Sequence, residues 1–95
     1  MEPLSEAEIE ARLPGLGAAW RREGDALVGE RESADFAGVI ALVNEIAVAA
    51  ELADHHPDLL IHGYRRLRIT LSTHSAGGIT ARDFALAEAI DALQA

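Results

Sequence analysis

One long helical pattern divides this 95-residue chain into two halves. The helix is expected to open at Asp35 and to stop before Pro57, because the residue before a proline resists helical geometry. Apolar side chains recur along it at the spacing of one buried helical stripe: Phe36, Val39, Ile40, Val43, Ile46, Ala47 and Ala50. Leu42 and Val48 widen the apolar surface, so the helix is expected to be buried on two sides or to meet a second subunit.

The sequence of the first half predicts a helix followed by a β-hairpin. Ser5 and Glu8 have the spacing of a capping box, so a helix is expected to begin there and to end at the following proline. Short strands are expected over Ala19–Arg22 and Ala26–Glu32, joined by a Gly-Asp turn. Trp20 is the only tryptophan and is expected to anchor this hairpin to the core.

The second half predicts two more strands and a last helix. The strands are expected over Leu59–His62 and Tyr64–His74. Along the second strand, alternate side chains face opposite sides of the sheet. One side carries Leu67, Ile69, Leu71 and Thr73. The other side carries Arg66, Arg68, Thr70, Ser72 and His74. After a Gly-Gly turn, Thr80 and Asp83 form a second capping box. The helix behind it is expected to use Phe84, Ala87, Ile90 and either Leu93 or Gln94 as its apolar positions.

This order of elements predicts the fold class. Helix, two strands, helix, two strands and helix (α-β-β-α-β-β-α) indicate an α+β, two-layer domain. Its sheet is expected to be four-stranded and antiparallel, with the helices packed on one face. Residues 1–95 are expected to form a single domain, since the chain has the length of one.

Composition excludes several classes of function. The net charge of -8 and the pI of about 4.8 disfavour binding to nucleic acid or to an anionic membrane. The chain has no cysteine, which excludes disulfides, thiolate nucleophiles and cysteine-type zinc sites. The N-terminus lacks the pattern of a signal peptide, and no apolar stretch approaches the ~20 residues of a membrane span. The expected location is the cytoplasm.

Three histidines are the candidate catalytic residues. His55 and His56 are adjacent at the end of the central helix, and His74 follows a strand and a chain reversal. Histidine titrates near pH 6.5, so an imidazole can act as acid or base at neutral pH without a metal or a cofactor. Glu51 lies four residues before His55 and is expected to favour its charged form. Asp83 follows His74 after the glycine turn.

Two other interpretations of these residues stay open. Paired histidines are more often surface or capping residues than catalytic ones, and Asp83 has a structural role in the capping box. A metal site is the second alternative, because His55, His56, His74 and Asp83 are all ligand types. Adjacent histidines on a helix point about 100° apart, however, so they chelate one ion poorly unless the backbone leaves the helix at Pro57. We therefore predict no metal, and we treat His62 as structural.

The spacing of these residues resembles a known signature. Glu51, the triplet His55-His56-Pro57, Tyr64, His74 and Asp83 occur in the order and spacing typical of pterin-4a-carbinolamine dehydratases. The segments Leu71–His74 and Gly77–Thr80 are also similar to that family, as are Trp20 and the pair Asp35-Phe36. The chain departs from the family at Arg31 and Ser33, where aromatic residues are usual. The resemblance spans nearly the whole chain.

The resemblance implies a function and a set of site residues. The family has a four-stranded antiparallel sheet backed by helices and removes water from 4a-hydroxytetrahydropterin, which gives quinonoid dihydropterin and recycles the pterin cofactor. Carried over, the catalytic and substrate-binding histidines are His55, His56 and His74. Asp54, Ser72, Thr73 and Ser75 would line the substrate pocket, while Glu51, Pro57 and Asp83 would support it. No cofactor or metal is implied.

The resemblance also implies partners. Family members are commonly dimers or tetramers, so a homodimer or homotetramer is expected. Animal members serve as dimerisation cofactors for a homeodomain transcription factor, and related domains act as assembly factors for a carbon-fixing enzyme. A non-catalytic binding module of the same fold is therefore the main alternative to a dehydratase. A metal-dependent hydrolase or metal carrier is the third hypothesis.

Overall fold

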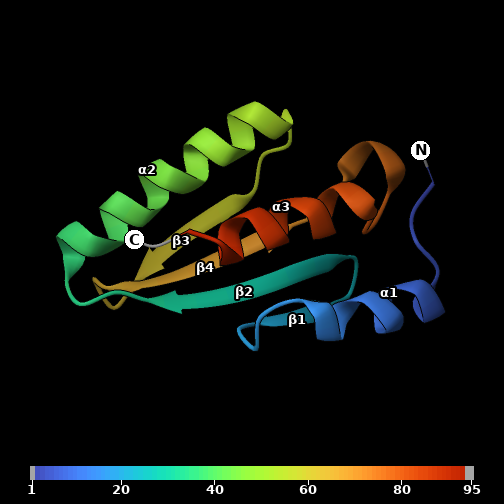
Figure 1. Ribbon diagram of the computed structural model, residues 1–95, viewed down its shortest axis with the longest axis horizontal. Helices are drawn as coiled ribbons and strands as arrows, with labels where there is room; N and C mark the ends of the chain where they lie inside the picture. Colours follow the sequence, from blue (N-terminus) through green and yellow to red (C-terminus); the bar gives the residue numbers. More distant parts are fainter. Residues whose placement is uncertain (1, 94–95) are drawn as a thin grey trace.

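A computed structural model describes residues 2–93 of the chain, so Gln94 lies outside the described residues. The four strands are β1 (Trp20–Glu23), β2 (Ala26–Glu32), β3 (Asp58–His62) and β4 (Arg66–Leu71). The helices are α1 (Glu6–Arg12), α2 (Phe36–Ala53) and α3 (Ala81–Asp91), with short 3₁₀ turns η1 (Leu13–Gly15) and η2 (His74–Ala76). Figure 1 shows these elements in the predicted order, which confirms the α+β fold class.

The sheet is antiparallel throughout, with the strand order β1-β2-β4-β3. The predicted alternation along β4 is confirmed: Leu67, Ile69 and Leu71 are buried in the core, whereas Arg66 and Arg68 are exposed and Thr70 is half-buried. The predicted strand Tyr64–His74 is too long at both ends. Tyr64 has a φ of 54° in a tight turn, β4 ends at Leu71, and the last predicted residue, His74, belongs to η2.

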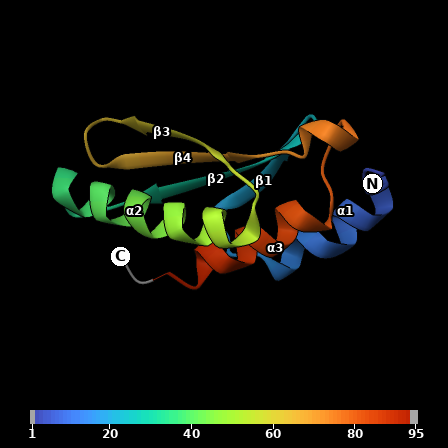
Figure 2. The same ribbon diagram turned by 90° about the horizontal axis from the view of Figure 1, so that it is seen from above.

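The long helices cover one face of the sheet, as Figure 2 shows for α2 and α3. On that side α2 buries Val39, Leu42, Ile46 and Ala50. The predicted stripe was therefore wrong at Phe36 and Ile40, which are 53% and 37% exposed, and at Ala47, which is also exposed. A helix lying on a single sheet face buries one stripe, and here that stripe passes through Leu42. Within residues 2–93, the other face of the sheet carries no long helix.

The exposed side of α2 leaves a large apolar surface. Val48 is 61% exposed and Leu52 is 85% exposed. With 18 residues and a mean hydropathy of 1.8, α2 is long and apolar enough to cross a membrane, although no apolar segment of that kind was expected from the sequence. A core helix of a soluble protein passes the same test, so this finding is weak evidence for a membrane span.

Local signals set the starts of α1 and α3 as predicted, whereas α1 ends at Arg12, before the proline that was expected to end it. Ser5 and Glu8 form the capping box of α1, and Thr80 and Asp83 form that of α3. Trp20 is buried, and its indole Nε1–H donates a hydrogen bond of 2.8 Å to Asp91 Oδ1, which ties β1 to the end of α3. The predicted anchoring role of this tryptophan is confirmed.

Candidate functional site

A cavity of about 350 Å³ lies at one end of the sheet. Its strand residues alternate with buried core residues, so it lies on the face opposite α2 and α3. Its floor includes Thr70 of β4 and Asp58 of β3, which are cross-strand partners and alternate with the buried core residues of their strands. The complete lining comprises Asp25, Ala26, His56, Asp58, Thr70, Ser72, His74 and Gly77. The volume is within the range of small-molecule sites.

The end of α2 brings His56 to this cavity. Asp54 adopts the left-handed conformation (φ 49°, ψ 45°) and ends the helix, so the two histidines that follow leave the helical path. His55 is buried and His56 is exposed. The expected pairing of Glu51 with His55 is wrong for the same reason: Glu51 Oε2 lies 3.5 Å from His56 Nε2.

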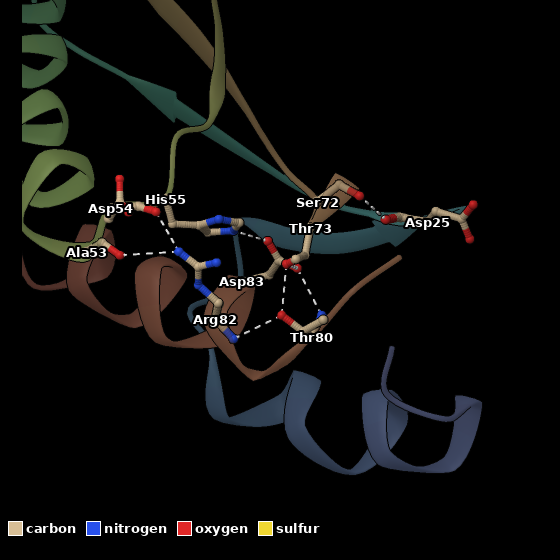
Figure 3. Close-up of polar contacts among 9 residues, drawn as sticks. All are labelled: Asp25, Ala53, Asp54, His55, Ser72, Thr73, Thr80, Arg82 and Asp83. Carbon is tan, nitrogen blue, oxygen red and sulfur yellow. Dashed lines mark hydrogen bonds and ion pairs between the residues drawn. The ribbon is translucent and has the colours of Figure 1, made fainter. Parts of the chain in front are cut away.

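The opposite wall of the cavity comes from the turn after β4. His74 begins η2 and is exposed, and Gly77 closes the turn in the left-handed region with a φ of 75°. Just before it, the Ser72 hydroxyl donates a hydrogen bond of 2.8 Å to the backbone carbonyl of Asp25. This bond, drawn in Figure 3, fastens the β1–β2 turn to the end of β4.

A buried polar network lies behind the cavity, and Figure 3 shows its members. The Nε2 atom of His55 is 2.5 Å from Oδ1 of Asp83, whose side chain is fully buried. The other oxygen of Asp83 accepts hydrogen bonds from the Thr73 hydroxyl at 2.8 Å and from the Thr80 backbone N–H at 2.9 Å. A buried carboxylate is costly unless it is paired and hydrogen-bonded, and both oxygens of Asp83 meet that condition.

Arg82 fixes the helix end from which both histidines emerge. Its Nη2 atom donates a hydrogen bond of 2.5 Å to the backbone carbonyl of Asp54 and lies 3.5 Å from that of Ala53. A cation at the C-terminus of a helix is favoured by the helix dipole. The sequence analysis did not identify this residue, because nothing in the local pattern shows that the start of α3 reaches the end of α2.

The structure divides the predicted site residues into two groups. His56, Ser72 and His74 line the cavity. His55, Thr73 and Asp83 form the buried network. The remaining predicted residues lie outside the cavity lining within residues 2–93: Glu51, Asp54 and Ser75 are exposed, and Pro57 is half-buried.

Sequence reasoning missed three polar residues of the cavity. Thr70 could have been found, because strand alternation places it on the same face as Ser72 and His74. Asp58 directly follows the His-His-Pro triplet but starts an edge strand, which carried no functional signal. Asp25 was treated only as a turn residue, and its approach to the cavity depends on the pairing of β2 with β4.

The arrangement suits proton transfer. Two imidazoles, from His56 and His74, face one polar cavity that is large enough for a small molecule. One ring can donate a proton while the other accepts one. Across residues 2–93, no three His, Asp or Glu side chains are grouped closely enough to hold a metal ion.

Comparison of the sequence with known proteins gives consistent results. Residues 2–93 match the family model described as pterin 4 alpha carbinolamine dehydratase. A protein of Acidobacterium capsulatum is 46% identical over 98% of this chain and 99% of its own length. A protein of Chloroflexus aurantiacus is 47% identical over 96% of each chain. Both are provisionally named pterin-4-alpha-carbinolamine dehydratases.

Solved structures with the same fold include proteins described by different roles. The crystal structure of a transcriptional coactivator/pterin dehydratase from Brucella melitensis superposes with a TM-score of 0.88 and 30% identity, covering 96% of this chain and 97% of that one. A pterin dehydratase-like protein identified as a RuBisCO assembly factor of the alpha-carboxysome gives a TM-score of 0.65 and 25% identity, covering 78% and 87%.

Proposed function

Because this chain belongs to the pterin-4a-carbinolamine dehydratase family, we propose that it removes water from 4a-hydroxytetrahydropterin to give quinonoid dihydropterin. The observation that carries the proposal is the shared cavity of His56 and His74. In this proposal the protein serves the recycling of a pterin cofactor and is located in the cytoplasm.

The proposed reaction needs one proton donor and one proton acceptor. A protonated imidazole gives its proton to the 4a-hydroxyl group, the C4a–O bond breaks, and water leaves. A neutral imidazole takes the proton of a ring N–H as the carbon–nitrogen double bond forms. Each such proton transfer contributes roughly 10²–10⁴ in rate. His56 and His74 can share these two roles because they line the same cavity.

His55 has a different position within the proposed catalytic set of His55, His56 and His74. Its ring is bonded to Asp83 and only 8% of its side chain is exposed. In the proposal it holds the corner from which His56 projects. Of the other residues predicted to contact substrate, Ser72 lies in the cavity wall. Asp54 and Ser75 lie close in sequence to the two cavity histidines and would contact substrate at the rim of the cavity.

A dehydration assay tests this function. Purified wild-type protein should accelerate the loss of water from 4a-hydroxytetrahydropterin, and His56→Ala and His74→Ala should each reduce kcat/KM by about 10²-fold or more. His62→Ala is the matched control, because His62 lies on the same sheet face but does not line the cavity. Its Nε2 atom lies 3.7 Å from Oε1 of Glu30 instead. A wild-type rate equal to the uncatalysed background would reject the proposal.

A non-catalytic binding module is the second candidate function. The support for this candidate is that two proteins of similar fold are described as a RuBisCO assembly factor and as a transcriptional coactivator/pterin dehydratase. A binding role does not require the histidines. Simultaneous replacement of His56 and His74 by alanine, which leaves the buried His55–Asp83 pair in place, would therefore abolish dehydration but leave a binding role intact.

We also propose that the protein is a homodimer or homotetramer and that it binds neither nucleic acid nor membrane. The support for self-association is the apolar surface of α2, on which Phe36, Val48 and Leu52 are all more than half exposed. Burying such a surface between subunits is favourable by roughly 25 cal/mol per Å². The net charge of -8 disfavours contact with phosphate-rich surfaces.

A further inference from the structure

Each histidine of the cavity directly follows a buried residue that is bonded to Asp83. His56 follows His55, whose Nε2 atom is 2.5 Å from Oδ1 of Asp83. His74 follows Thr73, whose hydroxyl donates to Oδ2 of the same carboxylate at 2.8 Å. Consecutive Cα atoms are only 3.8 Å apart, so fixing the two buried residues also fixes the backbone of the two exposed ones. One carboxylate thus joins the two segments that carry the cavity imidazoles.

The Thr73 hydroxyl makes two hydrogen bonds within this network, as Figure 3 shows. It has one hydrogen, which it donates to Asp83, so the 2.8 Å contact between Thr73 Oγ1 and Thr80 Oγ1 must be a bond donated by Thr80. Thr80 Oγ1 in turn accepts the backbone N–H of Arg82 at 3.2 Å. The Thr73 residue is only 3% exposed, which leaves its hydroxyl unavailable to a molecule in the cavity.

We infer that Thr73 is a positioning residue: its hydroxyl orients the Asp83 carboxylate and thereby sets the separation between His56 and His74. The resemblance to the dehydratase family implied instead that Thr73 lines the substrate pocket. The catalytic part of the inference rests on the proposed function, because the separation matters only if both rings act on one molecule. It predicts a change in turnover and no change in binding, since a misplacement of about 1 Å can cost 10²-fold in rate.

The experiment compares Thr73→Val, which replaces the hydroxyl by a methyl group of similar size, with Thr73→Ser, which keeps the hydroxyl and loses the methyl group. The assay measures kcat and KM for dehydration, and calorimetry measures Kd for 7,8-dihydrobiopterin as a stable pterin probe. For Thr73→Val we expect kcat to fall by about 10- to 100-fold while KM and Kd stay within about twofold. In NMR spectra, the ring signals of His55 and His74 should shift. Thr73→Ser should restore both kcat and the ring signals.

Thr70→Val is the matched control. It removes the same atoms from the floor of the cavity, where Thr70 contacts the space a ligand would occupy. It should alter Kd and leave the ring signal of His55 unchanged. Asp83→Asn changes the carboxylate that accepts the Thr73 hydrogen bond. It should reproduce the lowered kcat and the shifted ring signals of Thr73→Val, which keeps the inference testable if the valine variant does not fold.

Three results would overturn the inference. A raised Kd with unchanged kcat in Thr73→Val would mean that the side chain contacts substrate. Unchanged ring signals of His55 and His74 would mean that the hydroxyl does not position them. Failure of Thr73→Ser to restore kcat would remove the hydroxyl from the explanation. A wild-type protein without dehydratase activity would instead reject the proposed function, and the ring signals would still decide the structural role of Thr73.

Discussion

Replacement of Asp83 by alanine is expected to lower the free energy of unfolding by about 3–5 kcal/mol, as when one partner of a buried pair is removed and the other is left unpaired. Asp83 is fully buried and accepts hydrogen bonds from the His55 ring, the Thr73 hydroxyl and the Thr80 backbone N–H. Each buried donor left without a partner costs roughly 1–3 kcal/mol. These costs overlap, because one carboxylate satisfies all three donors, so their full sum is not expected.

Urea unfolding at pH 7, followed by circular dichroism, measures this loss directly. Native domains have roughly 0.05–0.15 kcal/mol of stability per residue, which for 95 residues gives about 5–14 kcal/mol. A loss of about 3–5 kcal/mol leaves the variant with about 0–11 kcal/mol, so it is expected to unfold at a lower urea concentration than the wild type. In thermal unfolding, about 4–8 °C per kcal/mol predicts a fall in Tm of roughly 12–40 °C.

Asp91→Ala is the matched control for this experiment. Asp91 also accepts two hydrogen bonds, from the Gly17 backbone N–H and from Trp20 Nε1, both at 2.8 Å, but it is exposed to solvent. Water can replace part of what is lost, so a cost of about 1 kcal/mol is expected. Equal losses in the two variants, or a loss below about 1 kcal/mol in Asp83→Ala, would refute the argument that burial gives Asp83 its importance.

Three further predictions follow from the sheet and from α2. A Cβ atom at Gly29 would lie 2.9 Å from the Trp20 ring, so Gly29→Ala should displace the ring, cost about 1–3 kcal/mol in urea unfolding and shift the fluorescence of Trp20. Burial raises the pKa of the Glu30 carboxyl, but bonds from two neighbouring arginines outweigh it and hold the pKa below its usual 4.5. Glu30→Gln should therefore lower stability at pH 7, and its difference from wild type should disappear as the pH falls through that lowered pKa. Val48→Glu should convert an oligomeric wild type to monomers in analytical ultracentrifugation if α2 forms the subunit contact; oligomers that persist would place the contact elsewhere.

The parts of the fold that depend on near neighbours in sequence were predicted well. The capping boxes at Ser5 and Thr80 involve side chains three residues apart, and the alternation of β4 reflects the geometry of a single strand. The burial of α2 was predicted less well, because apolar spacing shows that a helix has a core side and does not show how wide that side is. Phe36 and Ile40 are exposed because the sheet covers only one side of α2.

The candidate site depends more strongly on contacts between distant segments. The histidine signature pointed to the end of α2 and the turn after β4, and one residue from each, His56 and His74, lines the same cavity. Asp25 belongs to the same cavity through the pairing of β2 with β4, which no local pattern records. Arg82 supports the end of α2 across the fold. Residues of this kind become visible only when the strand order is known.

The different roles of the two adjacent histidines follow from the way α2 ends. Had the helix continued, His55 would have lain one turn beyond Glu51, and their side chains would have met on one helical face. The left-handed conformation at Asp54 redirects the chain, so that His55 turns inward to Asp83 while His56 lies beside Glu51 at the cavity. A non-glycine residue pays about 1–2 kcal/mol for this conformation. The Arg82 bond to the Asp54 carbonyl offsets part of that cost. The start of α3 thus helps to hold the turn at Asp54 that directs the two imidazoles to different sides.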